Sequence, residues 1–178
     1  MSDGELFAFM GAFAIVGVIA FIIVVAIYLV DAIGRFKYLK ARNYQNAWFA
    51  FIPFLSNYGV VEATYGKVEK VKIWGVELPI IVVELYPLII AVLSGITSRI
   101  NYIGGVCGTV LSVVSILISI AVFKDIMERI ERPVTTGFAV LANIIAIVGA
   151  IKLLIDASST TPGQYDYTTD TRVLQSQQ

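Results

Sequence analysis

The sequence predicts an all-α, polytopic membrane protein with four transmembrane helices and an interfacial or re-entrant segment between the first and the second. Three observations support this fold class. Hydrophobic residues make up 58% of the 178 residues and charged residues only 15%, and the mean hydropathy is +0.83. The apolar residues also come in unbroken runs about as long as a bilayer is thick, instead of in helix faces. A soluble domain carries about 25% charged residues, so we exclude a soluble globular class.

The first predicted span covers residues 6–30, which contain no charged side chain. At about 1.5 Å per residue this run is long enough to cross a hydrocarbon core of about 30 Å. Asp3 and Glu5 precede it, where a cleavable signal peptide has basic residues. We therefore expect a retained helix.

Three further spans are predicted at residues 78–95, 103–123 and 138–155, each near the length that a bilayer requires. The third helix should continue beyond the membrane through a charged stretch until Pro133 ends it. Thr135 or Thr136 can then cap the fourth helix. These spans and the interfacial segment at residues 35–66 form one predicted domain, residues 1–156.

Residues 47–65 are apolar but interrupted by polar residues, so they could form a fifth span or lie at the interface. With four spans and the N-terminus outside, ten of the 13 Lys and Arg lie inside, whereas a fifth span leaves seven inside. The positive-inside rule therefore favours four spans in the cytoplasmic membrane, with both termini outside. Pro53 either begins a short helix toward Tyr65 or marks the turn of a re-entrant hairpin.

A basic cluster follows the first span, and aromatic residues are interleaved with it. Such a segment suits the inner leaflet, where each cation near anionic headgroups contributes about 1 kcal/mol. The candidate lipid-headgroup contacts are Arg35, Lys37, Lys40 and Arg42.

Glu84 is the candidate functional residue, because a carboxylate inside a span costs several kcal/mol unless it is protonated or partnered. It lies three residues before Pro87, which removes a backbone donor and frees a carbonyl near Val83. Discontinuous helices build ion and proton sites in this way. At a similar depth, the third and fourth helices offer further polar groups, which predicts an intramembrane polar layer of Glu84, Asn143, Ser115 and Ser119.

Small residues repeat at four-residue spacing in the third helix, at Gly104, Gly108 and Ser112. This spacing lets two helix backbones approach closely. The partner is another helix of this chain or a second protein, and we expect the former.

The block from Trp48 to Lys67 resembles a family of small bacterial integral-membrane proteins of unknown function. The matching residues are Trp48, Ile52, Pro53, Asn57, Tyr58, Gly66 and Lys67. The resemblance implies a helical membrane fold but no activity, because that family has no established one.

The last 22 residues, 157–178, are rich in Ser, Thr and Gln, which predicts a disordered outer tail. The chain has no His and one Cys, so we expect no metal, no cofactor and no enzymatic activity. Its net charge of zero gives no reason to expect a nucleic-acid partner. We expect an accessory protein that binds a membrane-protein partner or itself within the lipid bilayer. The alternative is a small proton- or cation-coupled transporter that uses Glu84.

Overall fold

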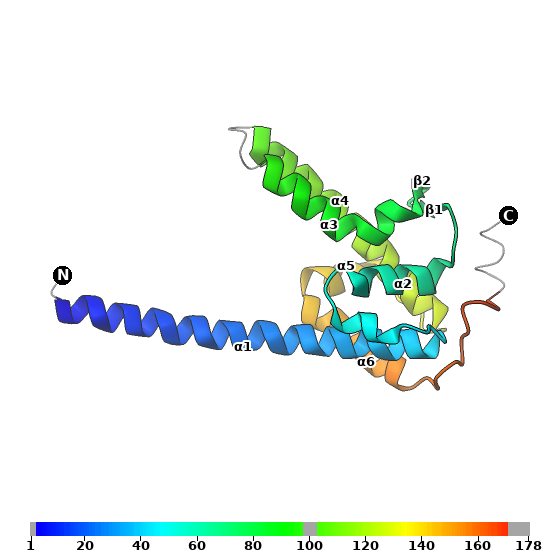
Figure 1. The fold of residues 1–178 in the computed structure, drawn as a ribbon, viewed down its shortest axis with the longest axis horizontal. Helices are drawn as coiled ribbons and strands as arrows, with labels where there is room; N and C mark the ends of the chain where they lie inside the picture. The colour runs from blue at the N-terminus through cyan, green and yellow to red at the C-terminus, as the bar shows by residue number, and fades with distance from the viewer. Residues whose placement is uncertain (1–2, 98–102, 171–178) are drawn as a thin grey trace.

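The structure is a computed structural model that describes residues 3–97 and 103–170, with side chains for residues 9–97 and 105–170. Within these ranges the chain forms six α-helices, one short 3-10 helix and one β-hairpin. Figure 1 shows a single long helix on one side, a helical hairpin that diverges from it, and a compact module where the two meet. The buried core of this module comes from residues 36–86 and 118–167. The chain is therefore mostly helical, as the sequence predicts.

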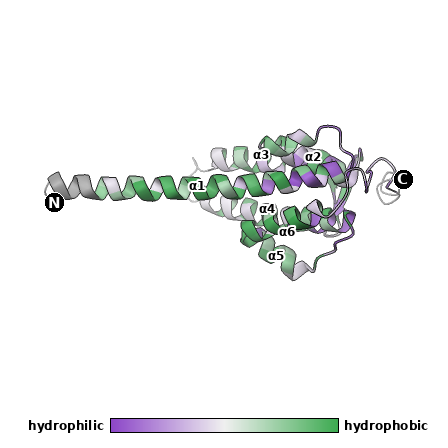
Figure 2. Ribbon diagram, turned by 90° about the horizontal axis from the view of Figure 1, so that it is seen from below, coloured by the Kyte–Doolittle hydropathy of each residue, from purple (hydrophilic) through white to green (hydrophobic). Residues whose placement is uncertain are grey.

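The longest element is α1, Asp3–Ala41, which at about 1.5 Å per residue is about 58 Å long. Residues 9–26 are all exposed, whereas Tyr38, Leu39 and Ala41 near its C-terminal end are fully buried. Figure 2 shows the same division, with an apolar rod that becomes polar only where it enters the module. One end of α1 therefore anchors it, and the remainder stands clear of the other helices.

The hairpin consists of α3, Ile80–Thr97, and α4, Ile103–Arg129. Three helical segments are long and apolar enough to cross a membrane: Phe9–Ala41, Ile80–Thr97 and Gly105–Arg129. They coincide with the first three predicted spans.

The fourth predicted span, residues 138–155, is wrong as one continuous helix. It is split at Ile145 into α5, Thr136–Ile144, and α6, Ala146–Ser158, which are bent by 119°. Gly149 permits the bend, because a Cβ there would lie 2.9 Å from the carbonyl oxygen of Ala142. The predicted cap is present, since Thr135 Oγ1 accepts a hydrogen bond from the Phe138 amide.

Both ends of the bent pair lie at the end of the molecule where α1 and α4 finish. Lys124 Nζ near the end of α4 donates to Thr136 Oγ1 at the start of α5, over 3.0 Å. After α6, the Gly163 amide donates to the carbonyl oxygen of Lys40 at 2.8 Å. The start of α5 and the end of α6 therefore lie at the same end of the molecule.

The segment between α1 and α3 forms the core of the module. It contains a 3-10 helix, η1 (Ala47–Phe51), and α2, Leu55–Tyr65, which at about 1.5 Å per residue is too short to cross a bilayer. Of the two structures that Pro53 allowed, the short helix is therefore the observed one. Its residues 59–65 are all buried, against Tyr38 of α1 and Met127 of α4 among others.

A hairpin of β1, Lys70–Ile73, and β2, Val76–Pro79, connects α2 to α3. The strands are antiparallel, and Ile73 pairs with Val76 across the turn. Both turn residues, Trp74 and Gly75, have positive φ angles of 53° and 83°, as a two-residue hairpin turn requires. Trp74 Nε1 donates to the Leu117 carbonyl on α4 at 3.0 Å, which fixes the hairpin along that helix.

The prediction of a disordered tail from residue 157 is wrong for the residues described here. Ala157 and Ser158 complete α6, and the following residues pack on the end of α1. The amides of Gly163, Tyr165 and Tyr167 donate to the carbonyls of residues 40, 41 and 42. The carbonyls of Lys40 and Ala41 lie in the last turn of α1, where the regular helical donors are missing, and Arg42 follows directly, so the tail adds donors to this helix end. Residues 171–178 of the predicted tail lie outside the described residues.

Candidate functional site

A cavity of about 360 Å³ lies where all six α-helices meet. Its two ends differ in chemistry. Val24 and Ile27 of α1 line the end toward the exposed part of that helix, and Asp31 and Arg35 line the end toward the module. Ala146 and Gly149 close one wall beside the bend between α5 and α6.

The charged end of the cavity holds an ion pair within α1. Arg35 Nε donates to Asp31 Oδ2 at 2.7 Å, and the two side chains are 31% and 35% exposed. Arg35 Nη1 lies 3.5 Å from Ser56 Oγ at the start of α2. The pair is neutral overall but presents both signs of charge to the cavity.

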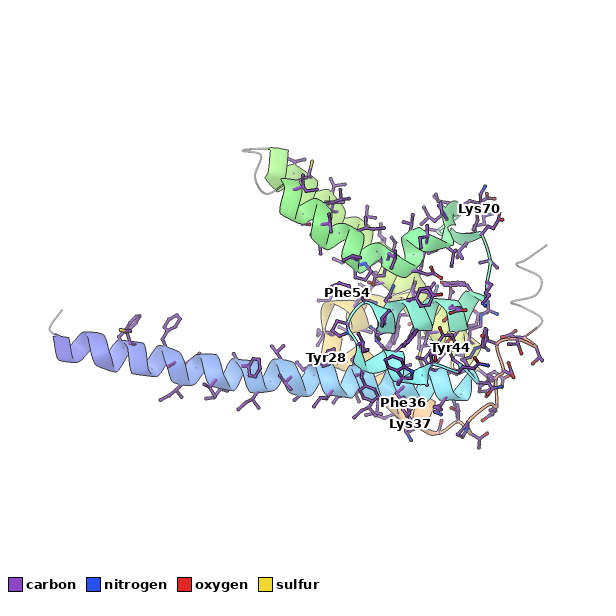
Figure 3. The ribbon with its side chains drawn as sticks, viewed as in Figure 1. Tyr28, Phe36, Lys37, Tyr44, Phe54 and Lys70 are labelled. Carbon is purple, nitrogen blue, oxygen red and sulfur yellow. The ribbon has the colours of Figure 1, made fainter. Side chains whose placement is uncertain are left out.

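Neutral polar groups also line the cavity. The Tyr86 hydroxyl on α3 and Ser119 Oγ on α4 are hydrogen-bonded at 2.7 Å. Asn143 on α5 donates from Nδ2 to the carbonyl oxygen of Ala139 at 2.8 Å, which uses one of its two amide hydrogens. Tyr28, labelled in Figure 3, donates to the carbonyl of Phe51 at 2.7 Å and ties α1 to η1.

The predicted polar layer is divided. Ser119 and Asn143 line the cavity, whereas Glu84 and Ser115 do not. Glu84 is buried, at 8% exposure, on the part of α3 that faces α2. The structure therefore brings together two of the three neutral members of the layer without its carboxylate.

The carbonyl that Pro87 leaves without a helical donor in α3 is bound by Asn57, which was not among the predicted site residues. Asn57 Nδ2 on α2 donates to the carbonyls of Val83 at 3.0 Å and of Glu84 at 2.6 Å. The freed carbonyl of Val83 therefore accepts a hydrogen bond from a buried side-chain amide and is not left open as an ion ligand. Asn57 belongs to the block of residues that resembles the small-membrane-protein family.

The four predicted headgroup contacts differ in exposure. Lys37 and Lys40 are exposed, and Arg35 is half-buried in its ion pair. Arg42 is fully buried, at 0% exposure, so its prediction as a lipid contact is wrong. α1 ends at Ala41, and the turn that follows places the Arg42 side chain inside the module.

Arg42 is the centre of a buried charge cluster. Its Nε donates to the carbonyl oxygen of Ala63 at 3.0 Å, and its Nη1 pairs with Asp170 at 2.8 Å. Arg129 at the end of α4 pairs with the same carboxylate at 3.7 Å. Asp170 therefore joins the tail, α1 and α4.

Two tyrosines hold α2 in place, and neither was singled out for this in the sequence. The Tyr44 hydroxyl donates to Glu62 Oε2 at 2.6 Å, and burial together with that carboxylate raises the pKa of Tyr44. The Tyr65 hydroxyl donates to Asp125 Oδ2 at 2.5 Å, and burial with the charge of Asp125 raises the pKa of Tyr65. Both phenols therefore remain donors at neutral pH.

The expected helix-packing face is not used within the described chain. A Cβ added at Gly108 would find nothing within 4 Å, and Ser112 Oγ donates to the carbonyl of Gly108 on its own helix. The expected partner helix of this chain is therefore absent at Gly108. The side-chain surroundings of Gly104 lie outside the described residues.

No family model, no curated protein and no solved structure matches this chain. The resemblance carried by the Trp48 to Lys67 block therefore stays a prediction. Among the described residues, no group of three or more Cys, Asp or Glu side chains is placed to hold a metal ion.

Proposed function

We propose that the protein crosses a cytoplasmic membrane three times, with the start of α1 outside and with α5–α6 as a re-entrant pair that dips in from the inner side. Eleven of the 13 Lys and Arg lie in the described residues, and this topology places all eleven inside. Lys152 of α6 would lie outside if the pair crossed. The exposed apolar residues at the bend, Ile144, Ile145 and Ile147, suit the hydrocarbon core.

Within this topology, the protein is a non-enzymatic accessory that binds another membrane protein. The observation that carries this proposal is the outer half of α1, residues 9–23, in which every side chain is exposed. The other two proposed spans, α3 and α4, pack against each other (Figure 1). Only α1 crosses without a neighbour along most of its length.

The occupant that fits this surface is a transmembrane helix. The outer half of α1 carries no charge and no amphipathic pattern, so it offers neither a pore lining nor a polar face. Helices associate in lipid through close van der Waals packing, which small residues permit. Gly11 and Gly17 lie on this half, and a Cβ added at either would find nothing within 4 Å, so a helix could approach the backbone there.

The alternative function, a proton- or cation-coupled carrier, rests on the burial of Glu84. A carrier needs polar groups along a path across the membrane. The described outer residues 9–23 of α1, 88–97 of α3 and 105–114 of α4 contain no charged side chain. Glu84 also lies close to the inner end of α3, so the accessory function is favoured. Loss of ion flux in Glu84→Gln, with unchanged folding, would reverse this preference.

Site-specific photocrosslinking in native membranes tests the proposed function. A photoreactive amino acid replaces Phe13 or Ile19 on α1, and Val113 on α4 serves as the control, because it is also exposed at a membrane level. We expect a defined adduct with a different membrane protein from the α1 positions and none from the control. Adducts with lipid alone at all three positions would contradict the proposal. An adduct between two copies of this chain would replace it with self-association.

A further inference from the structure

The cavity where the six helices meet runs from the hydrocarbon level to the headgroup level of the inner leaflet in the proposed topology. The predicted first span ends at residue 30, which places Asp31 at the inner edge of the hydrocarbon core. Arg35 lies about 6 Å farther along the helix, within the headgroup layer, and Val24 lies about 10 Å into the core. The cavity volume of about 360 Å³ falls within the range of about 300–1,000 Å³ that is usual for small-ligand sites.

The lining offers three kinds of group. Many of its residues are apolar, including Val24 and Ile27 on α1 and Ile126 on α4. Tyr86, Ser119 and Asn143 supply neutral donors and acceptors, and the ion pair of Asp31 and Arg35 supplies both signs of charge. A molecule that matches these groups has an apolar chain, a neutral polar linkage and a head with both charges, as a zwitterionic glycerophospholipid has.

We propose that this cavity binds one zwitterionic phospholipid of the inner leaflet. Arg35 Nε lies 2.7 Å from Asp31 Oδ2, so the two charged groups lie side by side, and the phosphate binds at Arg35 while the ammonium group folds back to Asp31. The ester groups then lie along Tyr86, Ser119 and Asn143. The acyl chains leave between α1 and the α3–α4 hairpin, which diverge from each other away from the module in Figure 1. This site is independent of whether the outer half of α1 has a protein partner.

The ion pair has capacity left for both charges of such a headgroup. Arg35 uses Nε for Asp31 and approaches Ser56 through Nη1, and Asp31 accepts through Oδ2. Within the described residues, Arg35 Nη2 and Asp31 Oδ1 make no hydrogen bond or ion pair. A guanidinium binds phosphate well, and a carboxylate oxygen binds an ammonium group well.

The neighbouring carboxylate selects against an anionic lipid. A headgroup with a net negative charge would gain the attraction of Arg35 but would also meet the repulsion of Asp31 at the same short range. A zwitterion places an opposite charge on each member of the pair. Removal of the Asp31 charge should therefore change the preference to anionic lipids.

Lipid analysis of the purified protein tests this inference. The full chain is extracted from its membrane in a mild detergent, and the phospholipids that remain bound are identified by mass spectrometry of the intact complex. We expect about one zwitterionic phospholipid per chain. Ala146→Phe fills the cavity wall and should reduce this occupancy at least tenfold. Ile147→Phe is the matched control, because Ile147 is exposed on the next residue of α6 and does not line the cavity.

Charge variants then test the headgroup assignment. Arg35→Gln should lose the bound lipid, and Asp31→Asn should retain a lipid but exchange the zwitterionic class for the anionic one. Each variant is first checked for an unchanged thermal transition in detergent. Equal occupancy in Ala146→Phe and Ile147→Phe, or an anionic lipid on the unaltered protein, would overturn the proposal. The photocrosslinks from Phe13 and Ile19 do not depend on this cavity, so failure of either proposal is recognised separately.

Discussion

Asp170→Asn should release the tail from the end of α1. Arg42 is fully buried and its Nη1 lies 2.8 Å from the Asp170 carboxylate, whose side chain is 8% exposed. The substitution leaves the Arg42 charge buried with its carbonyl contact to Ala63 and without its paired carboxylate. Removal of one partner from a buried ion pair costs about 3–5 kcal/mol. Arg129, 3.7 Å from the same carboxylate, loses this contact as well, so we expect no compensation from that side.

This cost has a direct readout in amide hydrogen exchange. The amides of Gly163, Tyr165 and Tyr167 are protected only while the tail donates to the end of α1. A loss of about 3 kcal/mol reduces the ratio of docked to undocked tail by roughly a hundredfold. Exchange at these three amides should accelerate by that factor in Asp170→Asn, measured by mass spectrometry of peptic fragments from the protein in detergent.

The matched control for this prediction is Asp166→Asn. The Asp166 side chain is partly exposed and accepts from Asn43 and Thr168, and its substitution leaves the Arg42–Asp170 ion pair in place. We expect less than a tenfold change in exchange for it. The double variant Arg42→Met with Asp170→Leu removes both charges and should restore most of the protection. Unchanged exchange in Asp170→Asn would refute the idea that this ion pair holds the tail.

Two further substitutions test the contacts that shape the cavity. Asn57→Leu removes the buried donor to the Val83 carbonyl, which has no helical donor because residue 87 is Pro, and should lower the free energy of unfolding by about 1–3 kcal/mol, whereas Asn46→Leu, at an exposed position, should have little effect. Gly149→Ala places a Cβ 2.9 Å from the Ala142 carbonyl and should cost about 1–3 kcal/mol, whereas Gly137→Ala enters open space and should cost nothing. Thermal unfolding in detergent measures both pairs, and equal transitions within either pair would contradict the contact it tests.

The three long apolar helices could be predicted from the sequence, because an uninterrupted apolar run of bilayer length is typical of a transmembrane helix. The bend at Ile145 could not be predicted from the sequence. Residues 138–155 have neither Pro nor a charge near the bend, so composition and length matched a straight span. The bend depends on the contact between Gly149 and Ala142, which is a property of packing and leaves no periodic signal.

The polar layer shows why depth alone does not define a site. Glu84, Ser119 and Asn143 can lie at one level, but only their rotation about the helix axes decides which of them share a cavity. Asn57 was missed as a polar partner because it lies outside the predicted spans, on the short helix α2. The freed carbonyl at Val83 was deduced from Pro87 alone, since that deduction concerns one helix and needs no knowledge of its neighbours.

Arg42 shows that a basic residue beside a membrane can indicate the orientation of the chain without contacting lipid. The positive-inside rule concerns which loops are translocated, so a lysine or arginine counts toward orientation wherever its side chain finally rests. Arg42 therefore supports an inner position for the end of α1 although it is buried away from lipid. Because the tail satisfies the carbonyls of α1 and the Arg42 charge, the tail must lie on the same side. In the proposed topology these contacts favour an inner position for the tail, independently of α5 and α6, and this position agrees with a re-entrant α5–α6 pair.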